Sequence, residues 1–143
     1  LVYTVDHHSG SEEHQLNEEY FDEDIYDFKE KRVNSFPLLI KNINDHKMQN
    51  IVPIISDAYD LSSKWSAKLG MLFIDGGHSL ESAMSDYNSW ESKILCNGAL
   101  VIHDIYEKPE DGGQAPFEIY KKALENNYKL YERVDTIVCL IKG

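Results

Sequence analysis

Cysteine is scarce in this chain, and long apolar runs are missing from it. The cysteines, Cys96 and Cys139, have neither the CxxC spacing of zinc and redox sites nor the number that a disulfide framework needs. Cys139 lies in the apolar run 136–141, which predicts a buried thiol in a reducing compartment, so we expect a cytoplasmic protein. No run reaches the ~18 apolar residues of a membrane span, and no signal peptide is visible, so we expect no membrane partner.

Phosphate-binding glycine motifs and positive charge are also lacking. The eight glycines include neither a GxGxxG pattern nor a P-loop with its lysine, which counts against an NAD dehydrogenase and against a P-loop enzyme. The chain has 14 Lys and Arg against 25 Asp and Glu, a net charge of −11. Proteins that bind a nucleic-acid backbone usually carry the opposite balance, so we expect no nucleic-acid partner.

What the chain does contain is an alternation of strand-like and helix-like patterns. Its 143 residues and 42% hydrophobic content predict a single globular domain over residues 1–143. Apolar runs predict strands at residues 1–5, 51–55, 71–74, 99–102, 128–134 and 136–141. Helical spacing predicts helices at residues 36–43, 61–68, 80–94 and 117–124. This order predicts an α/β fold with a mostly parallel sheet, closed by an antiparallel hairpin.

Local signals refine these elements. Pro37 in the first turn, after Asn34 or Ser35, starts the first predicted helix, and Ser79 is expected to cap the third. The apolar face of that third helix is expected to comprise Leu80, Ala83, Met84, Tyr87 and Ile94. The pair Asn97-Gly98 is typical of a turn before the strand at 99–102.

Residues 7–33 are polar and acidic, and they predict a long functional loop or a short irregular helix. His7, His8 and His14 lie in or beside this segment, but their spacing matches no zinc signature. We therefore expect these histidines to belong to a solvated loop.

The residues that carry chemistry follow two apolar runs. The run 71–74 ends in Asp75-Gly76-Gly77-His78, and the run 99–102 ends in His103-Asp104. Ligands bind beyond the carboxyl ends of parallel strands, so the two ends predict one shared site. Carboxylates and imidazole there can hold a divalent ion, and His78, at the mouth of the next helix, can act as a general base.

Asp6 and the pair Ser56-Asp57 give weaker signals. Asp6 ends the first strand, where an acid commonly accepts hydrogen bonds from a ribose. Ser56 and Asp57 end the strand at 51–55 and are equally typical of a turn and of a contact to an adenine ring.

Four blocks of sequence strongly resemble one family. They are residues 5–15, which include Asp6 and His7-His8-Ser9-Gly10; residues 72–79, which include Asp75-Gly76-Gly77-His78; Ile102-His103-Asp104; and residues 111–116. In this order they resemble the class I S-adenosylmethionine-dependent methyltransferases of the macrocin O-methyltransferase branch. The resemblance implies a Rossmann-like three-layer α/β/α sheet with strand order 3-2-1-4-5-7-6 and an antiparallel strand 7. Residues 1–6 resemble strand 2, which leaves the fold incomplete at its N-terminal side.

The family also implies roles for single residues. Asp6 matches the acid that binds the ribose of S-adenosylmethionine, and Ser56 and Asp57 match the adenine contacts. Asp75 also matches a residue at the cofactor. In metal-dependent relatives, the positions of Asp75, His103 and Asp104 bind a divalent ion, and Mg²⁺ is the expected ion. A histidine at position 103, where the family has an acid, is a departure from the pattern. His78 matches the base that takes the proton of the acceptor hydroxyl.

The activity implied is methylation of a hydroxyl on a small, sugar-like acceptor. The glycine-rich loop of strand 1 is absent and the chain begins without Met inside a strand-like run, so we expect further residues upstream. Two alternatives stay open: a metal-dependent hydrolase that uses the Asp/His cluster, and a non-catalytic binding protein on the same scaffold. The sequence also leaves open whether the chain forms a homo-oligomer.

Overall fold

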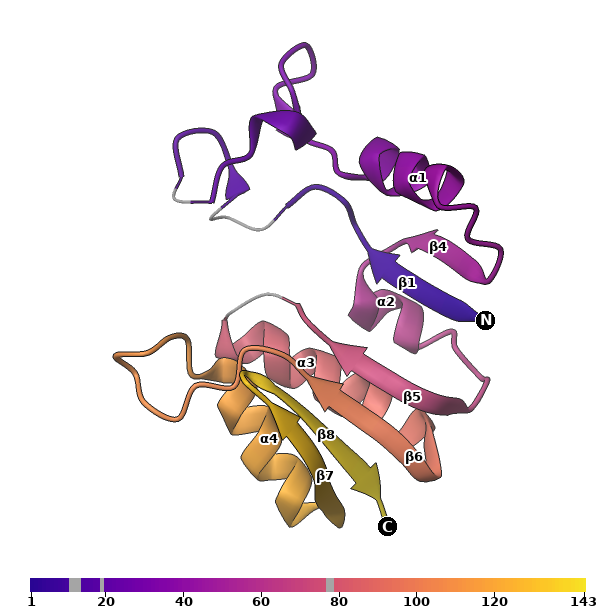
Figure 1. Cartoon of the computed structure of the whole chain (residues 1–143), viewed down its shortest axis with the longest axis vertical. Coiled ribbons are helices and arrows are strands. Elements are labelled where there is room, and N and C mark those ends of the chain that lie inside the picture. The colour runs from indigo at the N-terminus through magenta and orange to yellow at the C-terminus, as the bar shows by residue number, and fades with distance from the viewer. Residues whose placement is uncertain (11–13, 19, 77–78) are drawn as a thin grey trace. The chain divides into compact units, whose positions relative to one another are not determined.

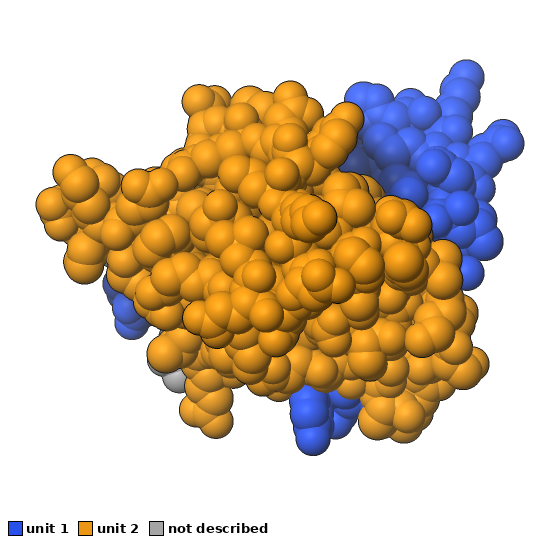
Figure 2. All heavy atoms as spheres, turned by 90° about the horizontal axis from the view of Figure 1, so that it is seen from below, with its two compact units in different colours: residues 1–60 blue, residues 61–143 orange. Residues whose placement is uncertain are grey.

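The computed structural model describes residues 1–10, 14–18, 20–76 and 79–143 of the chain (Figure 1). They form two compact units, residues 1–60 and 61–143, which Figure 2 shows in different colours. That residues 1–143 form a single domain stays a prediction.

The first unit is built on two parallel strands. β1 (Val2–Asp6) pairs with β4 (Ile51–Ile55) from Val2 opposite Ile51 to Asp6 opposite Ile55. Between them, α1 (Phe36–Asp45) begins with a proline in its first turn, as expected, although its N-cap Ser35 makes no capping bond through its side chain. Both strands therefore end at one edge, where Asp6 and Ser56 lie.

The polar segment that follows β1 contains little regular structure. Its described part holds the 3-10 turn η2 (Glu23–Ile25) and a small antiparallel hairpin of β2 (Tyr26–Asp27) and β3 (Arg32–Val33). Within the described residues, this confirms the prediction of a long loop.

The second helix begins and ends earlier in the chain than its sequence pattern predicts. α2 spans Ala58–Ser62 rather than residues 61–68. Asp57 Oδ1 accepts a hydrogen bond from the Asp60 N–H at 3.1 Å, so the helix starts directly after Asp57. At its other end, the Lys64 and Trp65 N–H groups donate to the carbonyls three residues before them, which closes the helix with tight turns.

The second unit holds a four-stranded sheet in the order β5-β6-β8-β7. Its strands are β5 (Leu69–Ile74), β6 (Ile94–Ile102), β7 (Tyr128–Val134) and β8 (Ile137–Lys142). β5 and β6 are parallel, whereas β8 is antiparallel to both of its neighbours, β6 and β7. This confirms the C-terminal hairpin and matches the 4-5-7-6 part of the expected strand order.

Helices α3 (Leu80–Trp90) and α4 (Ala115–Glu125) pack on the sheet, and the 3-10 turn η3 (Glu91–Lys93) leads from α3 into β6 (Figure 1). The core beneath them comprises Ile74, Ala83, Tyr87, Ile94, Leu100, Ile102, Ile105, Ala115, Ile119, Ala123, Tyr128, Val138 and Leu140. Ser79 caps α3, because its side chain accepts a hydrogen bond from the Ser82 N–H, as predicted. Leu80, expected on the buried face, is exposed, and Ile94 belongs to β6 rather than to the helix.

Asn97-Gly98 is not the turn that precedes a strand. β6 already begins at Ile94, and the register with β5 shifts, so that Leu69 faces Ile94 while Met71 faces Ala99. Between these paired positions β6 has more residues than β5, and the additional residues form an irregularity in which Asn97 has a φ of +62°. A turn-forming pair thus serves as a bulge inside the strand, because pairing to β5 continues on both sides of it.

The remaining expectations concern cysteine and membranes. Cys139 is partly buried, and burial raises the pKa of its thiol, with Glu132 adding to the effect. Cys96 is exposed. Among the described residues, no helix has the length and apolar character needed to cross a bilayer.

Candidate active site

The pairing of β5 with β6 brings the two acid-histidine segments together. Ile74 and Ile102 are partners at the carboxyl ends of these parallel strands, so Asp75 and His103 leave the sheet side by side. The His103 N–H donates to the Ile74 carbonyl at 3.1 Å, which continues the pairing one residue past the strands. The expectation that the two strand ends lie together is therefore confirmed for Asp75, His103 and Asp104, while their roles in a site stay predictions.

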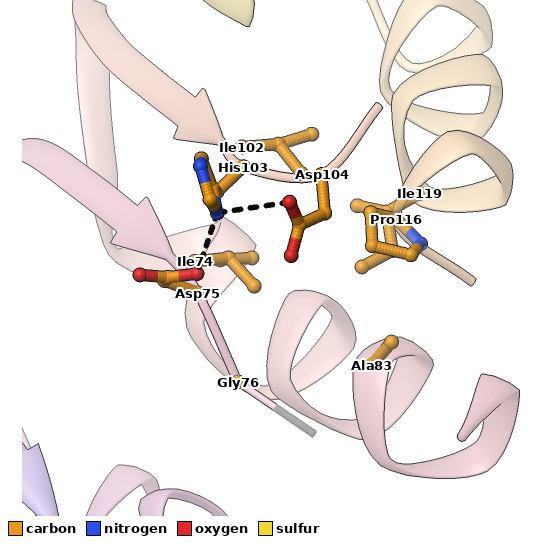
Figure 3. A pocket seen from close by; sticks show the side chains of 9 residues that line it. All are labelled: Ile74, Asp75, Gly76, Ala83, Ile102, His103, Asp104, Pro116 and Ile119. Atoms are coloured by element: carbon orange, nitrogen blue, oxygen red, sulfur yellow. Dashed lines mark hydrogen bonds and ion pairs between the residues drawn. The ribbon is translucent and has the colours of Figure 1, made fainter. Parts of the chain in front are cut away.

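The side chains of these three residues converge on one nitrogen (Figure 3). His103 Nδ1 lies 3.0 Å from Asp75 Oδ1 and 3.2 Å from Asp104 Oδ1. One potential ligand atom from each residue lies within 4.8 Å of the others, which makes the trio a candidate metal site. Asp104 is the least exposed of the three side chains, at 24%, so part of the negative charge is held away from bulk water.

The backbone fixes the position of Asp104. This residue has a φ of +57°, a left-handed conformation that costs most L-residues energy and that Asp tolerates better than most. The His103 N–H donates to Ile74 on one side, and the Ile105 N–H donates to the Thr136 carbonyl at 2.8 Å on the other. The backbone on both sides of Asp104 is thus fixed by hydrogen bonds to the end of β5 and to the turn between β7 and β8.

A small hollow lies against the cluster. It has a volume of about 10 Å³, and it is lined by Ile74, Asp75, Gly76, Ala83, Ile102, His103, Asp104, Pro116 and Ile119 (Figure 3). Its wall is polar on the side of the cluster and apolar elsewhere. A space of this volume accommodates a body of about the size of one water molecule.

The comparisons with known proteins bear on this site. A family model for a methyltransferase domain matches residues 1–105. The chain belongs to this methyltransferase family. The resemblance to class I methyltransferases inferred from the sequence is thereby confirmed.

Solved structures show the same fold. The O-methyltransferase NovP is 14% identical, with a TM-score of 0.67 over 98% of this chain and 59% of NovP. A methyltransferase from Podospora anserina, solved with S-adenosylhomocysteine bound, is 12% identical, with a TM-score of 0.57 over 82% of this chain and 57% of its own. The fold is therefore the Rossmann-like α/β fold of methyltransferases, and this chain spans less than three fifths of each relative's length.

Asp6, Ser56 and Asp57, three of the residues predicted to bind the cofactor, lie in the first unit, whereas the fourth, Asp75, lies in the second. The Ser56 N–H donates to the Asp6 carbonyl at 3.2 Å, so the ends of β1 and β4 are adjacent. Asp6 Oδ1 accepts from the His8 N–H at 3.0 Å, and the Asp6 side chain is 54% exposed. Asp57 caps α2, and Ser56 Oγ donates to the Asp57 carbonyl at 2.9 Å. Asp6, Ser56 and Asp57 are thus brought together at one strand edge.

The predicted base, His78, lies outside the described residues, as does Gly77. The assignment of His78 as the base stays a prediction.

His8 is a residue that the sequence reasoning misplaced. It is 7% exposed instead of lying in a solvated loop, and its ring packs against Phe36 with centroids 5.1 Å apart. Its Nδ1 lies 2.8 Å from Ser35 Oγ, while its Nε2 is buried without a hydrogen-bond partner in the described part of the chain. The nearest sequence signal is its place two residues after a strand end, and spacing alone does not distinguish it from His7.

A wider hollow of about 280 Å³ adjoins His8 in this unit. It is lined by His7, His8, Ser9, Arg32, Val33, Asn34, Phe36 and Ile55. His7 and His8 follow β1 and Ile55 ends β4, so the hollow lies at the carboxyl edge of the parallel pair, where α/β proteins bind their ligands.

Proposed function

We propose that this methyltransferase domain serves the transfer of a methyl group from S-adenosylmethionine to a hydroxyl oxygen of a small acceptor, with a sugar as the expected class. The observation that carries the proposal is the convergence of Asp75, His103 and Asp104 at the ends of two paired parallel strands. Family membership supplies the reaction type, and the cluster supplies groups suited to an acceptor hydroxyl.

The ribose side of the cofactor fits the first unit. Asp6 presents an exposed carboxylate, and carboxylates at this position of α/β folds accept hydrogen bonds from ribose hydroxyls. Ser56, whose N–H donates to the Asp6 carbonyl, and Asp57 after it are proposed to contact the adenine. The sequence of residues 1–143 has no glycine-rich loop for the methionine part. When the cofactor is bound, its sulfonium carries the methyl group to be transferred, and the neutral thioether is a good leaving group.

The acceptor side is assigned to the second unit. Asp75, His103 and Asp104 would hold a divalent ion, and such an ion lowers the pKa of a hydroxyl that coordinates it. Their donor set fits an ion, because their ligand atoms lie within 4.8 Å of one another. His78 takes the hydroxyl proton in this proposal, and the carboxylates of Asp75 and Asp104 orient the acceptor hydroxyl.

An assay for S-adenosylhomocysteine formation tests the proposal. The full-length protein is incubated with S-adenosylmethionine and a panel of sugars and phenols, with and without divalent ions. We expect product with at least one hydroxyl acceptor, and Asp75→Asn to lower kcat/KM by roughly 100-fold or more.

Glu125→Gln is the matched control, because Glu125 is an exposed carboxylate at the end of α4, outside the cluster. The proposal fails if no acceptor is methylated, or if Asp75→Asn and Glu125→Gln have the same activity. Metal-dependent hydrolysis of an ester substrate without S-adenosylmethionine would favour the hydrolase alternative instead.

A further inference from the structure

The candidate metal cluster contains an imidazole between two carboxylates. We infer that the site of Asp75, His103 and Asp104 selects a divalent transition ion over Mg²⁺. This inference rests on the ion assigned to the site in the proposed function. It departs from the Mg²⁺ that the family resemblance implies, and the departure originates in one residue, His103.

The chemistry of the donor atoms is the reason for this selectivity. Mg²⁺ is a hard ion that takes oxygen ligands and keeps several of its waters. Imidazole nitrogen is a softer donor that suits first-row transition ions, and sites of mixed nitrogen and oxygen ligands are typical of them. A set of two carboxylates and one imidazole therefore loses affinity for Mg²⁺ without losing it for the transition ions.

The geometry shows that the three side chains can share one ion. It suits Mg²⁺ and the transition ions alike, so the selectivity rests on the donor atoms. Neighbouring ligands of an octahedral ion with bonds of 2.0–2.1 Å lie about 3.0 Å apart. His103 Nδ1 lies 3.0 Å from Asp75 Oδ1 and 3.2 Å from Asp104 Oδ1. The imidazole nitrogen is thus already placed as a neighbour of both carboxylate ligands, and binding requires little movement.

The site is also built to hold an ion in place. Backbone bonds from His103 to Ile74 and from Ile105 to Thr136 hold the segment on both sides of Asp104. The adjoining hollow of about 10 Å³ has room for a body of the size of one ion or water. Three protein ligands leave open positions on the ion for an acceptor oxygen.

Titration with Mn²⁺ provides a stringent test, because Mn²⁺ is the weakest binder of the first-row series. Free Mn²⁺ is followed by electron paramagnetic resonance in the full-length protein, without S-adenosylmethionine, and Mg²⁺ is then added as competitor. We expect one Mn²⁺ to bind per chain, at least about tenfold more tightly than Mg²⁺. Equal affinities, or binding of neither ion, would overturn the inference.

Two substitutions at His103 locate the selectivity. His103→Asp makes the ligand set all oxygen, so we expect the preference for Mn²⁺ to shrink to about threefold or less. His103→Asn supplies an amide oxygen without adding charge, and it is expected to reduce the preference in the same direction. A preference that is unchanged in folded samples of both variants contradicts the role given to His103.

Matched controls separate this inference from the proposed function. His46→Asp makes the same change at an exposed histidine beyond the end of α1, and it should leave the preference intact. S-adenosylhomocysteine binding is measured on the same samples. If that ligand binds but neither ion does, the metal inference fails and the methyltransferase proposal stands. If Mn²⁺ binds selectively but the cofactor product does not, the reverse holds.

Discussion

Asp104 combines a left-handed backbone conformation with the ion-binding role that we propose for it. Its φ of +57° is unfavourable for most side chains, while Asp and Asn tolerate this region best after glycine. The residue therefore has to satisfy a conformation as well as provide a carboxylate. These two requirements can be separated by substitution.

Asp104→Asn and Asp104→Ala both remove the charge, but only the alanine variant loses tolerance for the left-handed conformation. We expect Asp104→Ala to have a free energy of unfolding lower than that of Asp104→Asn by about 1 kcal/mol. Urea denaturation of the two variants measures the difference. Equal stabilities would show that the positive φ imposes no cost at this position.

His8 shows where single residues escape prediction. It is buried, with Nδ1 against Ser35 Oγ, although its neighbour His7 is about half exposed. The burial depends on Phe36 and on the start of α1, which lie nearly 30 residues further along the chain. A local sequence pattern holds no information about such a distant partner, so it does not distinguish a buried histidine from an exposed one in this segment.

At the scale of elements, the end of α3 meets β7 through a partly buried group of polar side chains. Tyr128 OH donates to Glu91 Oε1 at 3.4 Å, and Lys142 Nζ lies 2.7 Å from the same carboxylate oxygen. Asn126 Nδ2 donates to Tyr87 OH at 3.2 Å. Burial, followed by the nearby Glu91 carboxylate, raises the pKa of Tyr128 well above 10.0, and burial also raises the pKa of Tyr87.

These shifts predict a loss of stability at high pH. Below pH 10.0 the two phenols are protonated in both states, and stability is unaffected. Above it the unfolded tyrosines ionise while the folded ones keep their protons, so the unfolded state is favoured. Tyr128 alone should lower the free energy of unfolding by up to about 1.4 kcal/mol per pH unit.

Urea denaturation between pH 8 and roughly pH 11 tests this slope. Tyr128→Phe should make the decline with pH shallower, and Tyr131→Phe, at an exposed position of the same strand, should not. Parallel curves for the wild type and Tyr128→Phe would contradict the raised pKa of Tyr128.

Most strands could be predicted from the sequence because each is a short apolar run with a clear end. The run that precedes Asp75 and the run that precedes His103 gave both the sheet and the cluster. The predicted boundaries of helices and strands were wrong where a polar residue is compatible with two local structures. Asp57 caps α2 earlier than periodicity suggested, and Asn97 sits in a bulge, since pairing with β5 outweighs its preference for turns.

At the scale of the whole molecule, the predicted site residues fall into two groups, one in each unit. Asp6, Ser56 and Asp57 gather at the strand edge of the first unit, while Asp75, His103 and Asp104 gather in the second. The matched family spans residues 1–105 and so includes both groups. The chain covers 59% of the length of NovP, and its sequence contains no glycine-rich loop for the methionine part of the cofactor.

The most direct test of the methyltransferase account is a calorimetric titration of S-adenosylhomocysteine into the full-length protein and its Asp6→Asn variant. The account predicts binding of one ligand per chain and an affinity roughly tenfold lower in the variant, because the amide replaces a charged acceptor for the ribose hydroxyls. Absence of binding to the wild-type protein, or equal affinities of the two proteins, would contradict it.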